Sequence, residues 1–177
     1  MPPRHGYNPR QMAPHSHHSG APSRNLRLAI VSASDTRTEA TDESGRLVRE
    51  HLTRAGHEVG HYEIVTDDPG QIRRAVAQAV SQFDGVVITG GSGIAPRDST
   101  IEAVRPLLDR ELEGFGELFR MLSYQEIGSK AWLSRALAGV SNGRLVVALP
   151  GSPAACRLAM EKLVVPELGH IAHLLGL

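Results

Sequence analysis

Residues 88–100 read Ile-Thr-Gly-Gly-Ser-Gly-Ile-Ala-Pro-Arg-Asp-Ser-Thr, and this stretch decides the fold. It includes the end of the apolar run 86–88, which is typical of a buried strand, and it leads into apolar positions with helical spacing over residues 99–108. A strand, a glycine-rich turn and a helix in this order favour anion binding, because backbone N–H groups point into the turn and the helix N-terminus adds partial positive charge. The glycines also let a ligand approach the backbone closely. The stretch therefore predicts a phosphate-binding loop.

The same alternation of strand and helix extends through the first part of the chain. Short apolar runs predict strands, and apolar residues at i, i+3 and i+4 predict helices. Repeated strand–helix units form a parallel sheet with right-handed crossovers and helices on both faces. The expected order is strand 28–32, helix 42–55, strand 61–66, helix 69–83, strand 85–89 and helix 99–108.

The second half of the chain adds a hairpin. The Asn-Gly pair at 142–143 is a hairpin signal, and it lies between two apolar runs. We therefore expect an α/β fold whose sheet is mostly parallel and contains one antiparallel strand. The expected elements are helix 115–123, strand 134–140, strand 144–149, helix 154–163 and helix 166–175.

The composition is that of a soluble globular domain. With 41% hydrophobic and 21% charged residues, a chain of 177 residues can bury a core of ordinary size. The net charge is zero, but residues 1–24 hold three arginines and no acid, so the rest of the chain is mildly negative. This balance argues against a nucleic-acid partner.

Targeting signals and cysteine usage indicate a cytoplasmic protein without a membrane partner. No apolar run approaches the roughly 20 residues of a membrane span, and the N-terminus lacks the apolar segment of a secretory signal. Cys156 is the only cysteine, so no intrachain disulfide can form, and its apolar helical pattern indicates packing. Residues 1–24 are rich in Pro, His, Ser and Gly and are expected to be a disordered tail, which leaves 25–177 as the folded domain.

Two aspartates follow neighbouring strands at the edge where open α/β sheets bind their ligands. Asp68 stands directly before a proline, which suits the first helical position, so Asp68 is expected to cap that helix and Asp67 is left over. Ser99 and Glu102 match a capping box, so Asp98 is not needed as a cap either. Two spare carboxylates are thus expected beside the phosphate-binding loop.

A cation would reconcile these carboxylates with a phosphate. Two anions repel a phosphate unless positive charge lies between them, and Mg²⁺ binds one or two carboxylates together with phosphate oxygens. Asp67 and Asp98 are therefore candidate Mg²⁺ ligands and catalytic residues; the alternative is that both only complete turns and helix starts. Arg97 and Arg135 are candidate phosphate-binding cations, with surface salt bridges as the alternative.

Other phosphate and hydrolase motifs are excluded. The dinucleotide fingerprint fails because a proline replaces its third glycine and because the loop follows the third strand instead of the first. The chain contains neither the Gly-Lys-Ser/Thr of a nucleoside-triphosphatase loop nor the Gly-x-Ser-x-Gly of a serine hydrolase. None of these three site classes therefore explains the loop.

Large apolar and aromatic residues gather in one region after residue 114. They form either an interface between copies of the chain or a core beneath a helix, and the small number of preceding strand–helix units favours the interface. The residues are Phe115, Leu118, Phe119, Met121, Leu122, Tyr124, Trp132 and Leu133.

With these motifs in place, the chain resembles the molybdopterin-binding MoaB/MogA family, which is related to the G domain of gephyrin. The resemblance rests on Thr89-Gly90-Gly91-Ser92-Gly93 followed by Arg97-Asp98-Ser99-Thr100, and it covers about residues 26–168. The segment 113–128 looks specifically MoaB-like. Further matches are Ser32, Asp35-Thr36-Arg37, Asp42, Ser44-Gly45, Asp67, Ser134-Arg135-Ala136 and Leu149-Pro150-Gly151-Ser152-Pro153.

The resemblance implies a three-layer α/β/α sandwich, the molybdopterin-binding fold, assembled as trimers or hexamers. It also implies molybdenum-cofactor biosynthesis with Mg²⁺ as cofactor and ATP and molybdopterin as substrates, and it links Asp67 and Asp98 to Mg-dependent adenylylation. The residues expected to bind substrate or phosphate are Thr89, Gly90, Gly91, Ser92, Gly93, Arg97, Ser134, Arg135, Pro150, Gly151 and Ser152.

Two functions are compatible with these expectations. In a molybdopterin adenylyltransferase, the molybdopterin phosphate would attack the α-phosphorus of ATP in line, and pyrophosphate would leave. In a non-catalytic molybdopterin carrier or scaffold, the phosphate-binding loop would remain without the chemistry. Binding of Mg-ATP separates the two.

Overall fold

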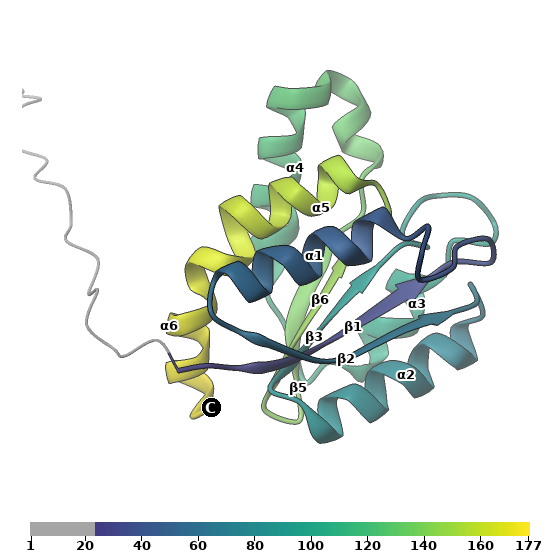
Figure 1. The fold of residues 1–177 in the computed structure, drawn as a ribbon. Coiled ribbons are helices and arrows are strands. Elements are labelled where there is room, and N and C mark those ends of the chain that lie inside the picture. The colour runs from purple at the N-terminus through teal and green to yellow at the C-terminus, as the bar shows by residue number, and fades with distance from the viewer. Residues whose placement is uncertain (1–23) are drawn as a thin grey trace, which may run out of the picture.

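The structure, a computed structural model, describes residues 24–177, which form a six-stranded sheet between two layers of helices (Figure 1). The tail predicted at residues 1–24 lies outside the described residues, apart from its last residue. The strand order is β2-β1-β3-β6-β5-β4. The strands are β1 (Arg27–Ala33), β2 (Glu58–Val65), β3 (Gly85–Thr89), β4 (Arg110–Glu111), β5 (Leu137–Ser141) and β6 (Arg144–Leu149).

The sheet is mostly parallel. β1 pairs parallel with β2 and β3, and β3 pairs parallel with β6. β5 pairs antiparallel with both β6 and β4, so within the described residues β5 alone runs against the other strands. Asn142 and Gly143 have φ angles of 50° and 73°, as a tight primed hairpin turn requires. The expected sheet and its hairpin are confirmed.

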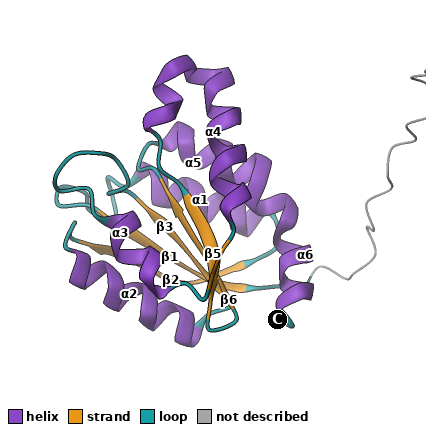
Figure 2. Ribbon diagram, turned by 180° about the vertical axis from the view of Figure 1, so that it is seen from behind, coloured by secondary structure: helices purple, strands orange, loops and turns teal. Residues whose placement is uncertain are grey.

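Helices cover both faces of the sheet (Figures 1 and 2). On one face Val48, Leu52 and Phe119 are fully buried against inward side chains of β1, β3 and β6. On the other face Ile72 and Ile101 lie in a second buried cluster. Two cores separated by one sheet make a three-layer α/β/α sandwich. The helices are α1 (Glu43–Arg54), α2 (Pro69–Gln82), α3 (Thr100–Val104), α4 (Glu113–Ile127), α5 (Pro153–Ala159) and α6 (Val165–Leu175).

The predicted helix 99–108 is wrong in its length. The α-helix ends at Val104, and a 3₁₀ turn continues it over Arg105–Leu107. Pro106 has no N–H to donate to the preceding turn, which explains the early end of the α-helix. Only five α-helical residues therefore stand behind the phosphate-binding loop.

Several other boundaries differ from the prediction. β2 begins at Glu58 instead of residue 61, because an edge strand paired only with β1 does not need an apolar start. β5 begins at Leu137 instead of residue 134, which leaves Ser134 and Arg135 in a turn outside the sheet. The two predicted C-terminal helices are joined by a π-helical turn over Met160–Val164. The short polar strand β4 and the 3₁₀ segment Gly128–Leu133 carry no periodic pattern and were not predicted.

The region of large apolar residues divides into core and surface. Phe119 is fully buried, whereas the side chains of Met121, Tyr124 and Trp132 are 53%, 64% and 77% exposed. Phe119 therefore belongs to the core, while the interface expected for the exposed residues of α4 and the 3₁₀ segment stays a prediction. Every helix in residues 24–177 is too short or too polar to traverse a lipid bilayer.

The parallel strands bring their carboxyl ends to one edge of the sheet. Register pairs Ala33 with Val65, and Thr89 with both Ser32 and Leu149. The loops that follow β1, β2, β3 and β6 therefore emerge together at this edge, as expected for a ligand site in an open α/β sheet.

Candidate functional site

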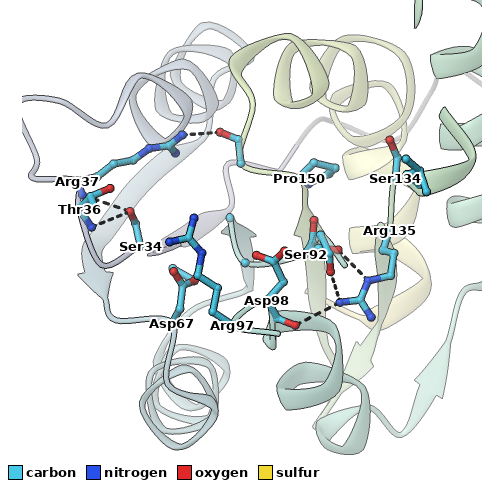
Figure 3. A pocket seen from close by; sticks show the side chains of 16 residues that line it. Ser34, Thr36, Arg37, Asp67, Ser92, Arg97, Asp98, Ser134, Arg135 and Pro150 are labelled. Carbon is cyan, nitrogen blue, oxygen red and sulfur yellow. Dashed lines mark hydrogen bonds between the residues drawn. The ribbon is translucent and has the colours of Figure 1, made fainter. Parts of the chain in front are cut away.

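These loops surround a cavity of about 410 Å³ (Figure 3). In Figure 3, Arg37 and Arg135 stand on opposite sides of the cavity, with Asp67, Arg97 and Asp98 between them. All predicted site residues except two line it: Asp67, Gly90, Gly91, Ser92, Gly93, Arg97, Asp98, Ser134, Arg135, Pro150 and Gly151.

The two exceptions, Thr89 and Ser152, make hydrogen bonds within the fold. Thr89 is fully buried, and its hydroxyl is 2.9 Å from that of Ser32. Ser152 is the N-cap of α5, where its Oγ accepts the N–H of Ala155 at 3.3 Å. Neither side chain reaches the cavity wall, so any part they play in ligand binding is indirect.

The phosphate-binding loop keeps several backbone donors available. The Gly90 N–H donates to the Leu149 carbonyl at 3.1 Å and so belongs to the framework. The amides of residues 91–94 have no hydrogen-bond acceptor within residues 24–177. Because α3 has only five residues, the loop amides contribute more to anion attraction than the helix dipole does.

The predicted capping box at Ser99 and Glu102 is wrong. Ser99 makes no side-chain cap, and its hydroxyl donates to the Asp67 carbonyl at 3.0 Å. The Glu102 carboxylate forms an ion pair with Arg135. Both side chains are taken by partners distant in sequence, which a local pattern could not reveal.

Asp98 closes a turn within its own loop. Its Oδ2 accepts the Ala95 N–H at 2.9 Å, and its own N–H donates to the Ala95 carbonyl at 2.8 Å. A Cβ at Gly93 would lie 2.5 Å from Asp98 Oδ2, so this packing requires a glycine at that position. Asp98 thus completes a turn, and its carboxylate also lines the cavity, so its role as a Mg²⁺ ligand stays a prediction.

The backbone of Asp67 is hydrogen-bonded on both sides, whereas one of its side-chain oxygens has no partner among the described residues. Its N–H donates to Asp35 Oδ1 at 3.0 Å, and its carbonyl accepts from Ser99. Its buried Oδ1 has no hydrogen-bond partner within residues 24–177. Burial raises the pKa of Asp67, and the charges of Asp35 and Asp98 raise it further, while Arg97 opposes them. As predicted, Asp68 is the residue that caps α2.

The two predicted arginines differ in what they contact. Arg135 donates to the Ser92 carbonyl at 2.8 Å and the Gly93 carbonyl at 2.6 Å, and it pairs with Glu102. It therefore fastens the phosphate-binding loop to the segment before β5. Arg97 is exposed and makes no hydrogen bond or ion pair with any described residue, so its guanidinium is available to a ligand.

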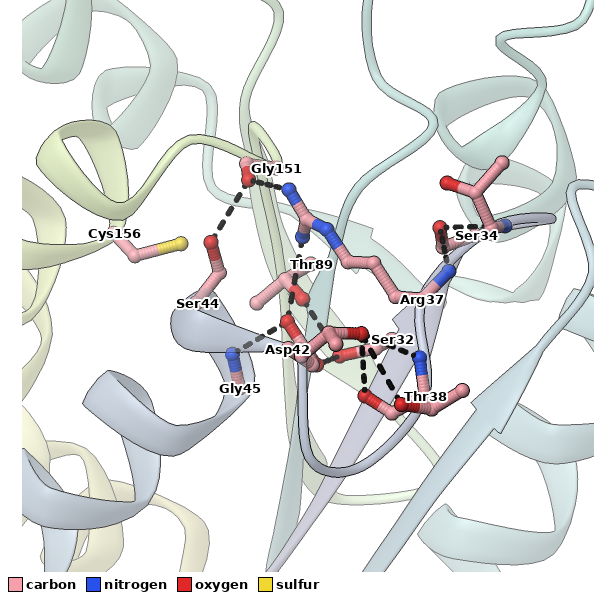
Figure 4. A network of polar contacts seen from close by, with 12 residues as sticks. Ser32, Ser34, Arg37, Thr38, Asp42, Ser44, Gly45, Thr89, Gly151 and Cys156 are labelled. Atoms are coloured by element: carbon pink, nitrogen blue, oxygen red, sulfur yellow. Dashed lines mark hydrogen bonds and ion pairs between the residues drawn. The ribbon is translucent and has the colours of Figure 1, made fainter.

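The site also contains residues that were not predicted to belong to it. Ser34, Thr36 and Arg37, in the loop after β1, line the cavity. Arg37 donates to the Gly151 carbonyl at 2.7 Å, which ties this loop to the one after β6 (Figure 4). The matching positions 35–37 were the signal that could have placed this loop at the site.

Asp42 anchors the same loop from below. It is 1% exposed and accepts hydrogen bonds from the Ser32 hydroxyl and from Arg37 at 3.3 Å, besides capping α1 through the Gly45 N–H (Figure 4). It also accepts a hydrogen bond from the Tyr62 hydroxyl at 2.6 Å. Burial alone would raise the pKa of Asp42, but these donors together lower it below its usual value.

Cys156 packs beneath the loop after β6. It is fully buried, and its Sγ lies 3.2 Å from the Pro150 carbonyl. Burial raises the pKa of this thiol to about 12, so it stays protonated at neutral pH. The prediction that Cys156 is a packing residue is confirmed.

Comparison with known proteins agrees with this geometry. The family model described as "Probable molybdopterin binding domain" matches residues 29–170. The chain belongs to this family. The molybdenum cofactor biosynthesis protein B of Bacillus cereus is 55% identical over 158 residues, which cover 88% of this chain and 93% of that protein.

Solved structures of the family have the same fold. A crystal structure of a molybdenum cofactor biosynthesis protein B is 53% identical, with a TM-score of 0.86, over 88% of this chain and 98% of that one. The tungsten cofactor synthesizing protein MoaB of Pyrococcus furiosus is 38% identical, with a TM-score of 0.76, over 85% of this chain and 96% of that one. The chain therefore has a part in molybdenum-cofactor biosynthesis, and its fold is the molybdopterin-binding fold.

Proposed function

We propose that this protein is a molybdopterin adenylyltransferase that uses ATP and Mg²⁺. In this reaction an oxygen of the molybdopterin phosphate forms a bond to the α-phosphorus of ATP, the bond from that phosphorus to the β-phosphate oxygen breaks, and pyrophosphate leaves. No covalent protein intermediate is required, which agrees with a cavity whose wall carries no activated nucleophile among the described residues.

The observation that carries the proposal is the pairing of carboxylates with phosphate-binding groups on one cavity wall. Asp67 and Asp98 lie beside the available amides of residues 91–94 and the unpaired Arg97. A phosphate bound to those amides would be repelled by the carboxylates unless a cation separated them. The donor set therefore fits a ligand that arrives with its own divalent cation, as ATP does.

Further features of Asp67 support cation binding. Its buried Oδ1 lacks a hydrogen-bond partner within the described residues, and a Cβ at Gly91 would lie 2.7 Å from that oxygen. Residues 24–177 contain no cluster of three or more His, Cys, Asp or Glu side chains that could hold a metal. Asp67 and Asp98 would thus hold Mg²⁺ together with phosphate oxygens, which is the usual mode for this ion. When bound, the ion would offset phosphate charge and polarise the phosphoryl oxygens.

The residues around the cavity would provide binding and orientation. The loop amides and Arg97 would hold phosphate oxygens and stabilise the charge that develops during transfer. Arg37 and Arg135, which are engaged with carbonyls, would keep the loops on either side at a fixed separation. Ser134, Pro150 and Gly151 would shape the pockets for the pterin and the nucleotide.

An adenylylation assay with molybdopterin, ATP and Mg²⁺, run with and without a chelator, tests the proposal. We expect pyrophosphate release and adenylylated molybdopterin, both abolished by the chelator. Titration calorimetry with Mg-ATP provides the second test. Molybdopterin binding without any heat from Mg-ATP would contradict the enzyme and leave the non-catalytic carrier.

We also propose that the chain assembles with further copies of itself through α4 and the following 3₁₀ segment. The surface of these two elements exposes Leu118, Met121, Tyr124, Ile127, Trp132 and Leu133. Leu133 also lines the cavity, so such an interface would adjoin the site. Light scattering should give a multiple of the 19.1 kDa chain mass, and Trp132→Ser should lower it. A wild-type mass of one chain would refute the assembly.

A further inference from the structure

We propose that Thr100 is a positioning residue for Asp67, an inference that rests on the proposed function. Asp67 Oδ1 and Thr100 Oγ1 are the buried side-chain oxygens that lack a hydrogen-bond partner in the described part of the chain. Asp67 follows β2 and Thr100 begins α3, yet both oxygens lie against the same residue, because a Cβ at Gly91 would collide with both. Thr100 is fully buried.

The two atoms are chemically complementary. A hydroxyl donates a hydrogen bond and a carboxylate oxygen accepts one, and buried groups of either kind are rarely left unpaired. Both oxygens lie beside Gly91. We infer that the Thr100 hydroxyl donates to Asp67 Oδ1 when the Asp67 carboxylate binds the cation. No described side chain donates to Asp67 Oδ1 in this structure.

The backbone around both residues is already fixed. The Thr100 N–H donates to the Gly91 carbonyl at 2.8 Å, and the Ser99 hydroxyl donates to the Asp67 carbonyl at 3.0 Å. The Asp67 N–H is bound to Asp35. The backbone of both residues is thus held in place, and the proposed bond would be made by the two side chains.

This bond would orient Asp67 Oδ2, the carboxylate oxygen that faces the cavity. Asp67 lines the cavity while its Oδ1 is buried, so a donor at Oδ1 leaves Oδ2 directed to the cavity for the cation. Carboxylates that bind metals are commonly held by such a second group, and its loss typically costs about tenfold to 100-fold in metal affinity.

The test is Mn²⁺ binding to the whole protein without nucleotide, followed by electron paramagnetic resonance. Thr100→Val should bind Mn²⁺ about tenfold more weakly than wild type, whereas Thr100→Ser, which keeps the hydroxyl, should stay within about twofold. Ser123→Ala removes a buried hydroxyl from α4 and should bind as wild type does. If valine packs badly, Thr100→Ala removes the hydroxyl without adding bulk.

Thermal unfolding in the presence of a chelator separates positioning from simple structural support. Because the Thr100 hydroxyl has no partner in the metal-free protein, Thr100→Val should unfold at no lower a temperature than wild type. Wild-type Mn²⁺ affinity in Thr100→Val, equal weakness in Thr100→Ser, or a large drop in unfolding temperature would each overturn the proposal.

Two further variants separate this inference from the proposed function. If Asp67→Ala and Asp98→Ala weaken Mn²⁺ binding and Thr100→Val does not, only the positioning role of Thr100 fails. If neither aspartate variant changes Mn²⁺ affinity, both the cation site and the role of Thr100 fail.

Discussion

Asp42 and Asp67 are two carboxylates at the same edge of the sheet, and their surroundings are opposite. Asp42 is 1% exposed and accepts hydrogen bonds at both oxygens, so its pKa is lowered. Asp67 has a buried oxygen without a partner in the described residues, and burial and neighbouring acids raise its pKa. The fold has paired both oxygens of Asp42 and has left an oxygen of Asp67 without a partner among the described residues.

The contrast separates polar groups that the fold has paired from those that it leaves unpaired beside the cavity. Arginines at the site divide in the same way, since Arg135 is bound to loop carbonyls and Arg97 is bound to nothing described. A polar group that the protein has already paired stabilises the fold, and removing it costs stability. A polar group that the fold leaves unpaired beside a cavity lowers stability and is retained for function.

The largest expected effect is the loss of activity in Asp67→Ala. We expect adenylylation to fall by about 1,000-fold, because the cation would lose a principal ligand. The unfolding free energy should not fall by more than about 0.5 kcal/mol, because the backbone hydrogen bonds of Asp67 remain and an unpaired buried oxygen is removed. Turnover and urea unfolding measure the two effects.

The adjacent Asp68→Ala provides the matched control. It removes the cap of α2 and should cost about 1 kcal/mol of stability while activity is kept. Equal turnover in Asp67→Ala and wild type would remove the cation argument.

The next effect is a loss of stability in Asp42→Ala. Removing this buried carboxylate leaves Arg37 and the hydroxyls of Ser32 and Tyr62 without their acceptor, which should cost about 3 kcal/mol. Urea unfolding measures the loss. The exposed acid Glu39, which lies 3.7 Å from Arg49, is the control, and Glu39→Ala should cost less than about 0.5 kcal/mol. If Asp42→Ala lowers the free energy of unfolding by as little as Glu39→Ala does, the hydrogen bonds of Asp42 do not stabilise the fold.

A smaller effect distinguishes the two arginines. Arg97→Ala should raise the KM for ATP about fivefold to tenfold and change stability little, because the exposed guanidinium makes no hydrogen bond or ion pair with any described residue. Arg135→Ala should instead lower the unfolding free energy by about 1–2 kcal/mol through the lost loop contacts. Steady-state kinetics and urea unfolding of both variants check this; a stability loss in Arg97→Ala would contradict it.

The smallest effect is in the pH dependence of unfolding. Asp42 has a lowered pKa, so its stabilisation is present above the usual value near 3.8 and is lost as the pH falls through the lower folded value. Asp67 has a raised pKa, so its ionisation reduces stability as the pH rises from 3.8 through the higher folded value. Relative to wild type, Asp42→Ala and Asp67→Ala should therefore change the pH slope in opposite senses. Urea unfolding between pH 3 and 6 tests this, and slopes of the same sign would contradict it.

Much of the fold could be predicted from local pattern. The strand Gly85–Thr89 and the Asp68 cap follow from apolar runs and from a proline at the first helical position, which act over a few residues. The Asn-Gly turn likewise depends only on backbone preference. The capping box at Ser99 failed because Asp67 and Arg135, which are distant in sequence, bind the two side chains that would have formed it.

The sequence alone determined the α/β architecture, the edge where the ligand loops meet and the aspartates that line it, because strand–helix alternation sets the direction of each strand. Only the tertiary structure decided which polar groups are paired. Arg37 reaches Gly151, Arg135 holds Ser92, and Thr100 and Asp67 keep unpaired oxygens beside Gly91. These contacts join residues many positions apart, and a hydrogen bond depends on atomic distances that residue spacing does not specify.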